Sequence, residues 1–301
     1  MTDPNKLRHP NSAYLRKLFK KIRKNRSLGS HDLTTMLLEE LLIWSLENNQ
    51  VTDKHVRSIC EIIVTLRPEM AAVYNTGYLL WSYFRDEFQQ KPASEAFPTA
   101  LRKLRGEKEK SARRLIAQAR EANFTDYDVL TFSRSSTVLE LLKNSPTIKK
   151  AVVLHSFPGE EGIDMAEDLK DNLEITFAYD VEAGYFLPKV DALYLGVDSL
   201  LSNGDIVNKT GSRLLASAAG ETAVRAVLDV WKYSPVEALT DIPRYPSPAD
   251  TPATLQRQHP MFETVPAGLI DSYITGRGIY SSGSKLFASL NDLQEAYEAL
   301  S

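Results

Sequence analysis

The sequence predicts an α/β fold, in which an all-helical domain is followed by a domain built on a parallel β-sheet. Two observations carry this prediction. Over the first 120 residues, apolar side chains recur at helical spacing, which is typical of amphipathic helices. After residue 123, short apolar runs alternate with helical patterns, as in a parallel sheet covered by helices on both faces. We therefore expect two domains, residues 1–122 and residues 123–301.

The composition is that of a soluble globular protein. The chain has 301 residues, 43% hydrophobic and 25% charged, and its formal charge of -3 argues against a dedicated nucleic-acid binder. No stretch approaches the roughly 20 apolar residues of a membrane span, and the start of the chain has no apolar run of signal-peptide length. The single cysteine, Cys60, suits a reducing compartment. We therefore expect a cytoplasmic protein with no membrane partner.

Helical patterns follow one another in the first domain. They cover residues 34–44, 54–66, 71–88 and 101–122, with Pro92 and Pro98 marking a break before the last one. An earlier amphipathic helix is expected within residues 6–26, which hold nine Lys and Arg and no acidic residue. We interpret this basic segment as the solvated face of a docked helix, with a nucleic-acid or membrane contact as the alternative.

Four buried strands are expected in the second domain, at residues 128–132, 151–154, 174–177 and 192–196. Helical patterns lie between or after them, at residues 137–143, 165–171 and 211–230. Sheets of this kind bind ligands at the carboxyl ends of their strands, in the loops that lead into the helices. We therefore expect the functional residues in those loops.

The loops after the first two strands carry polar side chains. Residues 133–137, with Arg134 among them, offer hydroxyls, free N–H groups and a positive helix end to a phosphate, although such serines are usually only helix caps. The loop after the second strand begins with His155, whose ordinary pKa is close to neutrality. No Asp or Cys spacing near His155 indicates a metal site, and we expect neither a metal nor a cofactor.

The loop after the fourth strand is the most informative stretch. Asp198 directly follows a buried strand, where burial can shift the pKa of a carboxyl group into the range of acid–base work. Asn208 and Lys209 stand at the expected start of the next helix, where they can hold an anionic ligand.

Residues 198–211 also resemble the "GAD…NG-vvNKiGT" motif of one protein family. That motif is shared by the alpha, beta and delta subunits of translation initiation factor 2B, methylthioribose-1-phosphate isomerase and archaeal ribose-1,5-bisphosphate isomerase. Residues 66–75 resemble the family's "RPTavN" motif, and residues 130–139 its "iLTh…S.tVl" motif. Lys232 is similar to a late lysine of the family, and residues 266–279 to its "tPpelIt…iTe.Gi" motif. The resemblance covers residues 29–279 and implies a helical domain followed by a Rossmann-like one.

The resemblance implies catalytic roles that this chain keeps only in part. The isomerases use a cysteine after the first strand and the aspartate of "GAD" as an acid–base pair, and here Asp198 is present while Ser133 stands at the cysteine position. A thiol titrates near 8.5, whereas a serine hydroxyl is too weak an acid to exchange protons at neutral pH without an adjacent base. The enzymes' "E-[ST]-R-P-x-x-[QE]-G" loop becomes residues 155–162 here, with Phe157 in place of the arginine. Cys60 lies in the helical domain and is not assumed to replace the thiol.

The phosphate-binding residues implied by the resemblance are better kept. They are Arg67 in the helical domain and six residues of the second domain, Ser135, Ser136, Thr137, Asn208, Lys209 and Lys232. The family's N-terminal "RGA" phosphate loop is reduced to residues 26–30. These observations favour an initiation factor 2B-like regulatory protein that binds a phosphorylated sugar or nucleotide without efficient catalysis.

Two other functions stay open, so the chain is not assigned as an enzyme. One is an aldose-1-phosphate or ribose-1,5-bisphosphate isomerase that uses Asp198 with Ser133 or His155 in place of the cysteine. The other is an assembly subunit with a vestigial pocket. The resemblance also implies a homodimer through the C-terminal domain and leaves open a higher oligomer and a protein partner, while nucleic acid is not an expected partner.

Overall fold

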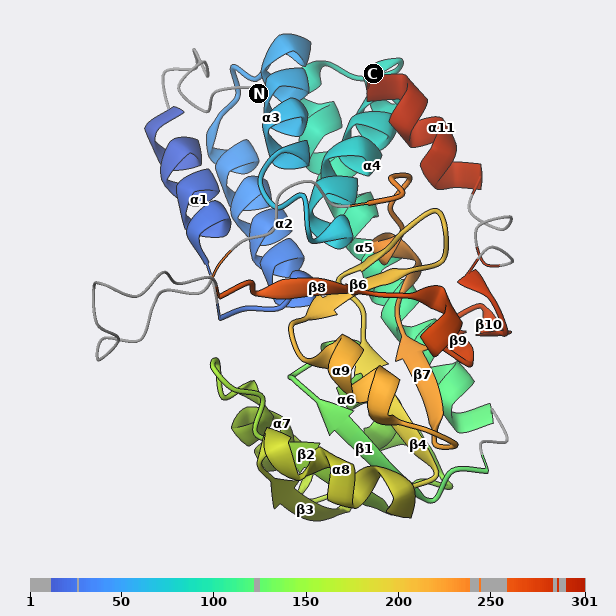
Figure 1. Ribbon diagram of the computed structural model, residues 1–301. Coiled ribbons are helices and arrows are strands. Elements are labelled where there is room, and N and C mark those ends of the chain that lie inside the picture. The colour runs from blue at the N-terminus through green and yellow to red at the C-terminus, as the bar shows by residue number, and fades with distance from the viewer. Residues whose placement is uncertain are drawn as a thin grey trace, which may run out of the picture. The chain divides into compact units, whose positions relative to one another are not determined.

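A computed structural model describes residues 12–25, 27–121, 125–238, 244, 259–283, 286 and 291–300 of the chain (Figure 1). The chain divides into two compact units. The first comprises Met1–Ser111 with Ala288–Ser301, and the second comprises Ala112–Phe287. The domain boundary that the sequence places after residue 122 stays a prediction.

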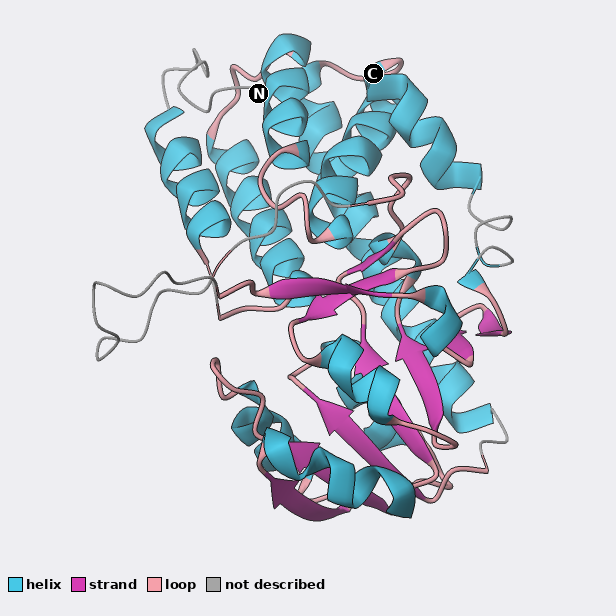
Figure 2. Ribbon diagram, viewed as in Figure 1, coloured by secondary structure: helices cyan, strands magenta, loops and turns pink. Residues whose placement is uncertain are grey.

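The first unit is built from helices, as the sequence predicts (Figure 2). Its described helices are α1 (Ser12–Lys24), α2 (Ser30–Glu47), α3 (Asp53–Val64), α4 (Ala71–Phe88), the first part of α5 (Ala93–Glu121) and α11 (Asn291–Leu300). Thr52 begins α3 through a capping box, because its hydroxyl accepts the His55 N–H while the His55 ring accepts the Thr52 N–H. Completely buried residues of successive helices, among them Leu37, Ile59 and Phe84, form the core of the unit.

Pro98 lies inside α5, where the sequence predicted a break. A proline removes one N–H from the helical ladder and is tolerated near a helix start, where the first N–H groups have no intrahelical partner. Because α5 begins at Ala93, Pro98 loses only a bond to the carbonyl of Ser94, in the second turn. The proline therefore does not end the helix, and α5 begins earlier than expected.

The second unit contains a seven-stranded sheet with the order β10-β9-β7-β4-β1-β2-β3. The four predicted strands are all present, as β1 (Asp128–Phe132), β2 (Lys150–Leu154), β3 (Glu174–Ala178) and β4 (Ala192–Gly196). They are joined by β7 (Ala223–Val227), β9 (Ser272–Thr275) and β10 (Gly278–Tyr280), and only β10 is antiparallel to its neighbour. Counted along this sheet alone, the six parallel strands run 3-2-1-4-5-6, an order of doubly wound sheets.

Alternate residues of the parallel strands point to opposite faces of the sheet, and both faces are buried at the central strands. The prediction of a buried strand is wrong for β3, which lies at the edge of the sheet and exposes Glu174, Thr176 and Phe177. Leu130 and Leu193 belong to the core on one face, and Val129 and Tyr194 to the core on the other. Helices α6 (Ser136–Asn144) and α7 (Glu161–Leu169) pack on the second face, and the turn-rich segment with α8 (Ala183–Phe186) packs on the first. Within the described ranges, no helix combines the length and apolar character of a membrane span.

A second, smaller sheet corrects one prediction. Its antiparallel order is β5 (Ser199–Leu200), β6 (Ile206–Lys209) and β8 (Phe262–Val265), so Asn208 and Lys209 lie on a strand rather than at a helix start. The helix expected over residues 211–230 covers only α9 (Ser212–Ala218). Gly220 follows it with a φ of 63°, a left-handed conformation that stops the helix, and the chain then enters β7.

Candidate functional site

The expected functional loops of the second unit gather at one edge of the large sheet. Ser133 follows β1 and Asp198 follows β4, and these two strands are hydrogen-bonded neighbours with Phe132 opposite Leu195. From this pair the strand order runs in opposite directions, to β2 on one side and β7 on the other. Because ligands bind doubly wound sheets at such a reversal, this edge is the candidate site.

Ser133 adopts a left-handed backbone conformation with a φ of 67°. Its N–H donates to the hydroxyl of Ser156 at 2.7 Å, and that hydroxyl donates to the Leu154 carbonyl at 2.9 Å. The helix α6 is capped by Ser135, whose hydroxyl accepts the Val138 N–H at 3.5 Å. Ser133 is therefore not the helix cap, and its backbone ties the end of β1 to the loop after β2.

The loop after β1 packs tightly against the end of β4. A Cβ on Gly196 would lie 2.5 Å from the Cβ of Ser135, so only glycine fits there. The Ser135 hydroxyl lies 2.9 Å from that of Thr137, which donates to the Val227 carbonyl at 3.2 Å. Thr137 is thus committed to an internal contact, whereas Ser135 and the half-buried Ser136 lie at the start of α6 beside β4.

Asn208 lies beside the same glycine, with its amide oxygen 3.8 Å from the position that a Cβ of Gly196 would take. Its amide nitrogen donates to the Ser212 hydroxyl at 2.9 Å. Asp198 is half-buried, and its N–H donates to the Val207 carbonyl at 2.8 Å, which fixes the turn after β4. The structure therefore brings Asp198, Asn208 and Ser135 to one edge of the sheet.

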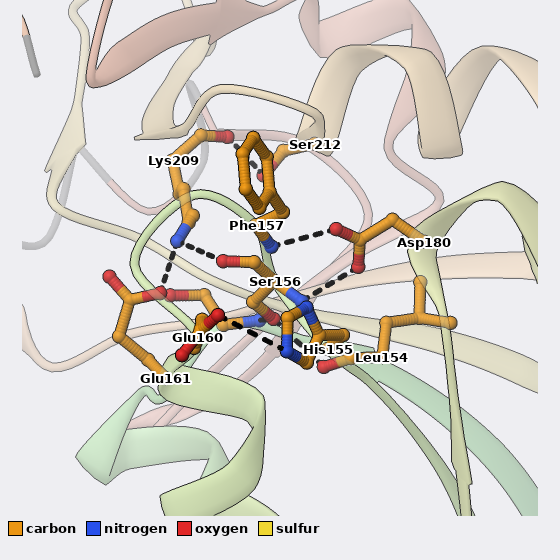
Figure 3. A network of polar contacts seen from close by, with 10 residues as sticks. Leu154, His155, Ser156, Phe157, Glu160, Glu161, Asp180, Lys209 and Ser212 are labelled. Atoms are coloured by element: carbon orange, nitrogen blue, oxygen red, sulfur yellow. Dashed lines mark hydrogen bonds and ion pairs between the residues drawn. The ribbon is translucent and has the colours of Figure 1, made fainter. Parts of the chain in front are cut away.

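Lys209 points from β6 into the loop after β2 (Figure 3). Its ammonium donates to the Ser156 carbonyl at 2.5 Å and forms an ion pair with Glu161 at the start of α7. The same ammonium lies 5.9 Å from the centre of the Phe132 ring. Burial lowers the pKa of Lys209, and Glu161 offsets part of that effect. The charge of Lys209 is therefore already balanced by a carboxylate of the chain itself.

Asp180 holds the loop after β2 from the other side (Figure 3). One carboxylate oxygen accepts the Ser156 N–H and the other accepts the Phe157 N–H, both at 2.7 Å. The Phe157 side chain, at the position of the isomerases' arginine, is 62% exposed. Asp180 and Glu161 were not among the predicted site residues, although Asp180 comes three residues after a predicted strand, a signal similar to the one that identified Asp198.

His155 lies in an aromatic environment at the sheet edge. Its ring centre is 5.8 Å from that of Phe177 and 5.6 Å from that of Tyr179, and its Nε2 is 3.8 Å from a Glu160 carboxylate oxygen. Within the described part of the chain, the ring makes no hydrogen bond to Ser133. His155 is therefore directed toward the β3 side of the loop rather than toward the end of β1.

Lys232 lies in a short turn of 3₁₀ helix (Val230–Lys232) that follows β7. The residue is only 3% exposed, and among the described residues no hydrogen bond or ion pair holds its ammonium. The nearby Asp229 carboxylate is used to cap the turn, accepting the Trp231 N–H at 2.9 Å. Lys232 Nζ is not among the described side-chain atoms that are fully buried without a partner, so the stem is buried while the charged end stays open to an anionic ligand.

Arg67 belongs to the first unit. The side chain is 2% exposed; its Nε forms an ion pair with Glu69, and its Nη1 donates to the Asn25 carbonyl at 2.8 Å. Its Nη2 is buried and has no hydrogen-bond partner among the residues that the structure describes. The Asn25 side chain shapes the turn into α2 by accepting the N–H groups of Ser27 and Leu28, while Arg26 lies outside the described residues.

Cys60 is completely buried in α3 of the first unit. Burial raises the pKa of its thiol far above the ordinary value, so the thiolate is not formed near neutral pH. Cys60 therefore does not supply the thiol that is missing at Ser133.

Comparison with known proteins identifies the family. The chain is 25% identical over 276 residues to ribose 1,5-bisphosphate isomerase of Archaeoglobus fulgidus, a match that covers 86% of this chain and 87% of that protein. Its fold is similar to that of translation initiation factor eIF-2B of Pyrococcus horikoshii OT3, with a TM-score of 0.74 and 21% identity over 91% of this chain and 98% of that one.

A second solved structure, 5-methylthioribose 1-phosphate isomerase of the same organism, has a TM-score of 0.70 and 18% identity over 93% of this chain and 87% of that one. The sequence model of the initiation factor 2 subunit family matches residues 18–282. Since this match covers most of the chain, the protein belongs to the initiation factor 2 subunit family.

Proposed function

We propose that the protein binds a phosphorylated sugar or nucleotide at the carboxyl edge formed by β1, β4 and β7, and that it acts as a regulatory subunit without efficient catalysis. The observation that carries the proposal is Lys232, a 3% exposed lysine with no counter-ion among the described residues. A phosphate ester would supply the anion. Ser135 and Ser136 at the start of α6, a helix end that favours anions, would supply further donors.

The ligand-binding role of Lys209 is narrower than the resemblance implies. Glu161 already neutralises its ammonium, and the Ser156 carbonyl accepts a second bond from it. In the proposal, Lys209 holds the loop after β2 in place beside the ligand, while Lys232 meets the phosphate. In the first unit, Arg67, whose buried Nη2 has no partner among the described residues, is proposed as an anion contact in its own right.

The replacement of the family's cysteine by Ser133 supports a regulatory rather than a catalytic role. A proton transfer between C2 and C1 of a sugar needs a group that titrates near the working pH. Among the described residues, His155 is turned away from Ser133, because its ring contacts Phe177 and Tyr179 and forms its ion pair with Glu160. Asp198 alone would have to serve as both acid and base.

The second candidate function is sugar-phosphate isomerisation. It is favoured by the similarity to ribose 1,5-bisphosphate isomerase over 86% of the chain and by the position of Asp198 at the same edge as Ser133. In that case Asp198 would act with Ser133, or His155 would move toward the end of β1 when substrate binds.

The assembly and location of the protein are part of the proposal. The family resemblance supports a homodimer through the C-terminal region, and a regulatory role requires a protein partner that responds to ligand occupancy. The single buried cysteine supports a cytoplasmic location.

A thermal-shift screen tests binding. The full-length protein is melted with ribose 1,5-bisphosphate, methylthioribose 1-phosphate and a nucleoside monophosphate, with inorganic phosphate as the control anion. A ligand that binds only the folded state stabilises it by about 2.7 kcal/mol at 100 times its Kd. We expect stabilisation by at least one phosphate ester beyond that given by inorganic phosphate, and a protein that responds to none of them would contradict the proposal.

A gain-of-function variant tests the catalytic half. Ser133→Cys restores the thiol of the isomerases, a far stronger acid than a serine hydroxyl. We therefore expect this variant to convert a bound aldose 1-phosphate to the ketose, as followed by NMR, and expect no conversion by Ser133→Cys with Asp198→Asn. Conversion by the unmodified protein at a rate similar to that of Ser133→Cys would favour the isomerase instead.

A further inference from the structure

Helix α1 carries a strong local charge that the proposed function does not use. Its 13 residues include six Lys and Arg and no acidic residue, whereas the whole chain has a formal charge of -3. Leu15, Leu18, Phe19 and Ile22 are at most 5% exposed, so the apolar side of the helix is packed inside the first unit. The cations occupy the other side.

The basic face of α1 consists of Lys17, Lys20, Lys21 and Lys24, together with Arg16 and Arg23. At 100° per residue, the six side chains fall within an arc of about 160°. The four lysines are exposed, and among the described residues no ion pair or hydrogen bond neutralises them. This face is therefore a concentrated positive surface open to an external anion.

We propose that the basic face of α1 binds the phosphate backbone of a nucleic acid without reading its sequence. Lys17 to Lys24 spans about 10 Å along the helix axis, and phosphates about 3.4 Å apart on one nucleic-acid strand place about four charges over that length. Lysine contacts phosphate well as a point charge, and among the described residues this face has no exposed Asn or Gln to read an adenine and no free aromatic ring on which a base could stack.

The same face is poorly suited to the two other anionic partners. A membrane-bound helix inserts its apolar side into the lipid, but the apolar side of α1 is already buried in the protein. Protein interfaces are enriched in aromatic residues and depleted in lysine. The one exposed aromatic residue of α1, Tyr14, bonds through its hydroxyl to Glu40 of α2.

Fluorescence anisotropy with a labelled single-stranded RNA of mixed sequence tests the proposal in the full-length protein. Four lysine–phosphate contacts predict a slope of about -2.8 in log affinity against log salt, which is a loss of about 50-fold between about 50 and 200 mM salt. Substitution of Lys17, Lys20, Lys21 and Lys24 by Gln should remove most of the affinity and flatten the slope. Lys and Gln have similar helix propensities, so α1 is expected to remain folded, which circular dichroism checks.

A matched control removes four exposed lysines elsewhere, Lys54, Lys110, Lys149 and Lys170, by the same change to Gln. This control has the same net charge as the test variant and should bind RNA like the unmodified protein. Equal RNA affinity of the two variants would overturn the proposal. Lysine-dependent binding of polyglutamate, or of vesicles that contain phosphatidylserine, with no binding of RNA would also overturn it.

Discussion

Replacement of Lys232 by Met separates a ligand-binding lysine from a structural one. The side chain is 3% exposed, and no hydrogen bond or ion pair holds its ammonium among the described residues. Met fills a similar volume without the charge. Because no described residue depends on the ammonium, we expect Lys232→Met to leave the Tm of the ligand-free protein within a few degrees of that of the unmodified protein.

The same substitution should weaken ligand binding. A hydrogen bond to a charged group contributes about 1.5–3 kcal/mol, so the loss of the phosphate contact corresponds to a Kd that is about 10 to 150 times weaker. Thermal melting with and without the stabilising phosphate ester measures both effects in one experiment. Lys149→Met is the control, because Lys149 is exposed and precedes β2 at the opposite edge of the sheet.

The substitution should therefore change ligand binding and leave the fold unchanged. If Lys232 has a structural role, Lys232→Met lowers the Tm of the free protein and leaves the ligand-induced shift unchanged. Either of those results would remove Lys232 from the proposed site.

Three further predictions concern the surroundings of the site. Gly196→Ala places a Cβ 2.5 Å from that of Ser135 and should lower the free energy of unfolding by about 1–3 kcal/mol in a denaturant melt. The control is Gly184→Ala, where a Cβ would have nothing within 4 Å, and it should lower that free energy by less than half as much. Equal losses would contradict the close packing at Gly196. Burial lowers the pKa of Lys209, so the unfolded chain binds that proton more tightly than the folded protein, and the free energy of unfolding rises with pH up to the ordinary pKa of 10.5. The unmodified protein should therefore gain stability relative to Lys209→Met as the pH rises toward 10.5. A stability difference that does not change with pH would refute this. Cys60, completely buried and with a raised pKa, should react with a thiol reagent only after unfolding, and rapid reaction of the native protein would show that α3 opens.

The sequence predicted the bounds of four strands well because each contains a short run of mainly apolar residues between loops. β1 and β4 have the predicted bounds, and β2 and β3 differ from them by one residue at an end. A strand that is covered on both faces carries apolar side chains in sequence, so its local sequence is enough to identify it. The loops that follow these strands, and the residues at their shared edge, could be expected for the same reason.

The contacts of Lys209 could not be predicted in this way. Ile206–Lys209 is a short strand whose partner, Phe262–Val265, lies more than 50 residues away in the chain. Nothing local distinguishes it from the start of a helix. The ion pair with Glu161 joins residues 48 positions apart, and it changes Lys209 from a free phosphate ligand into a residue that holds a loop.

The expected helix over residues 211–230 failed for a local reason. Gly220 lies inside that range and adopts a φ of 63°, and the alternation of Val224 and Ala226 with more exposed residues belongs to a strand. Because apolar residues stand on both sides of Gly220, the change from helical spacing to the alternation of a strand is not evident in the sequence. Ser133 is different, since no pattern in the sequence indicates its left-handed backbone.

The central claim is that this family member binds a phosphate ester without converting it. The most direct test is NMR of the unmodified protein with a saturating sugar phosphate. The sugar is the phosphate ester that stabilises the protein most in the thermal-shift screen, where that ligand is an aldose 1-phosphate. In any other case it is ribose 1,5-bisphosphate. The account predicts line broadening of the bound sugar and no ketose signal over the lifetime of the sample. Accumulation of the ketose, lost in Asp198→Asn, would contradict it and make the protein an isomerase that works without the thiol.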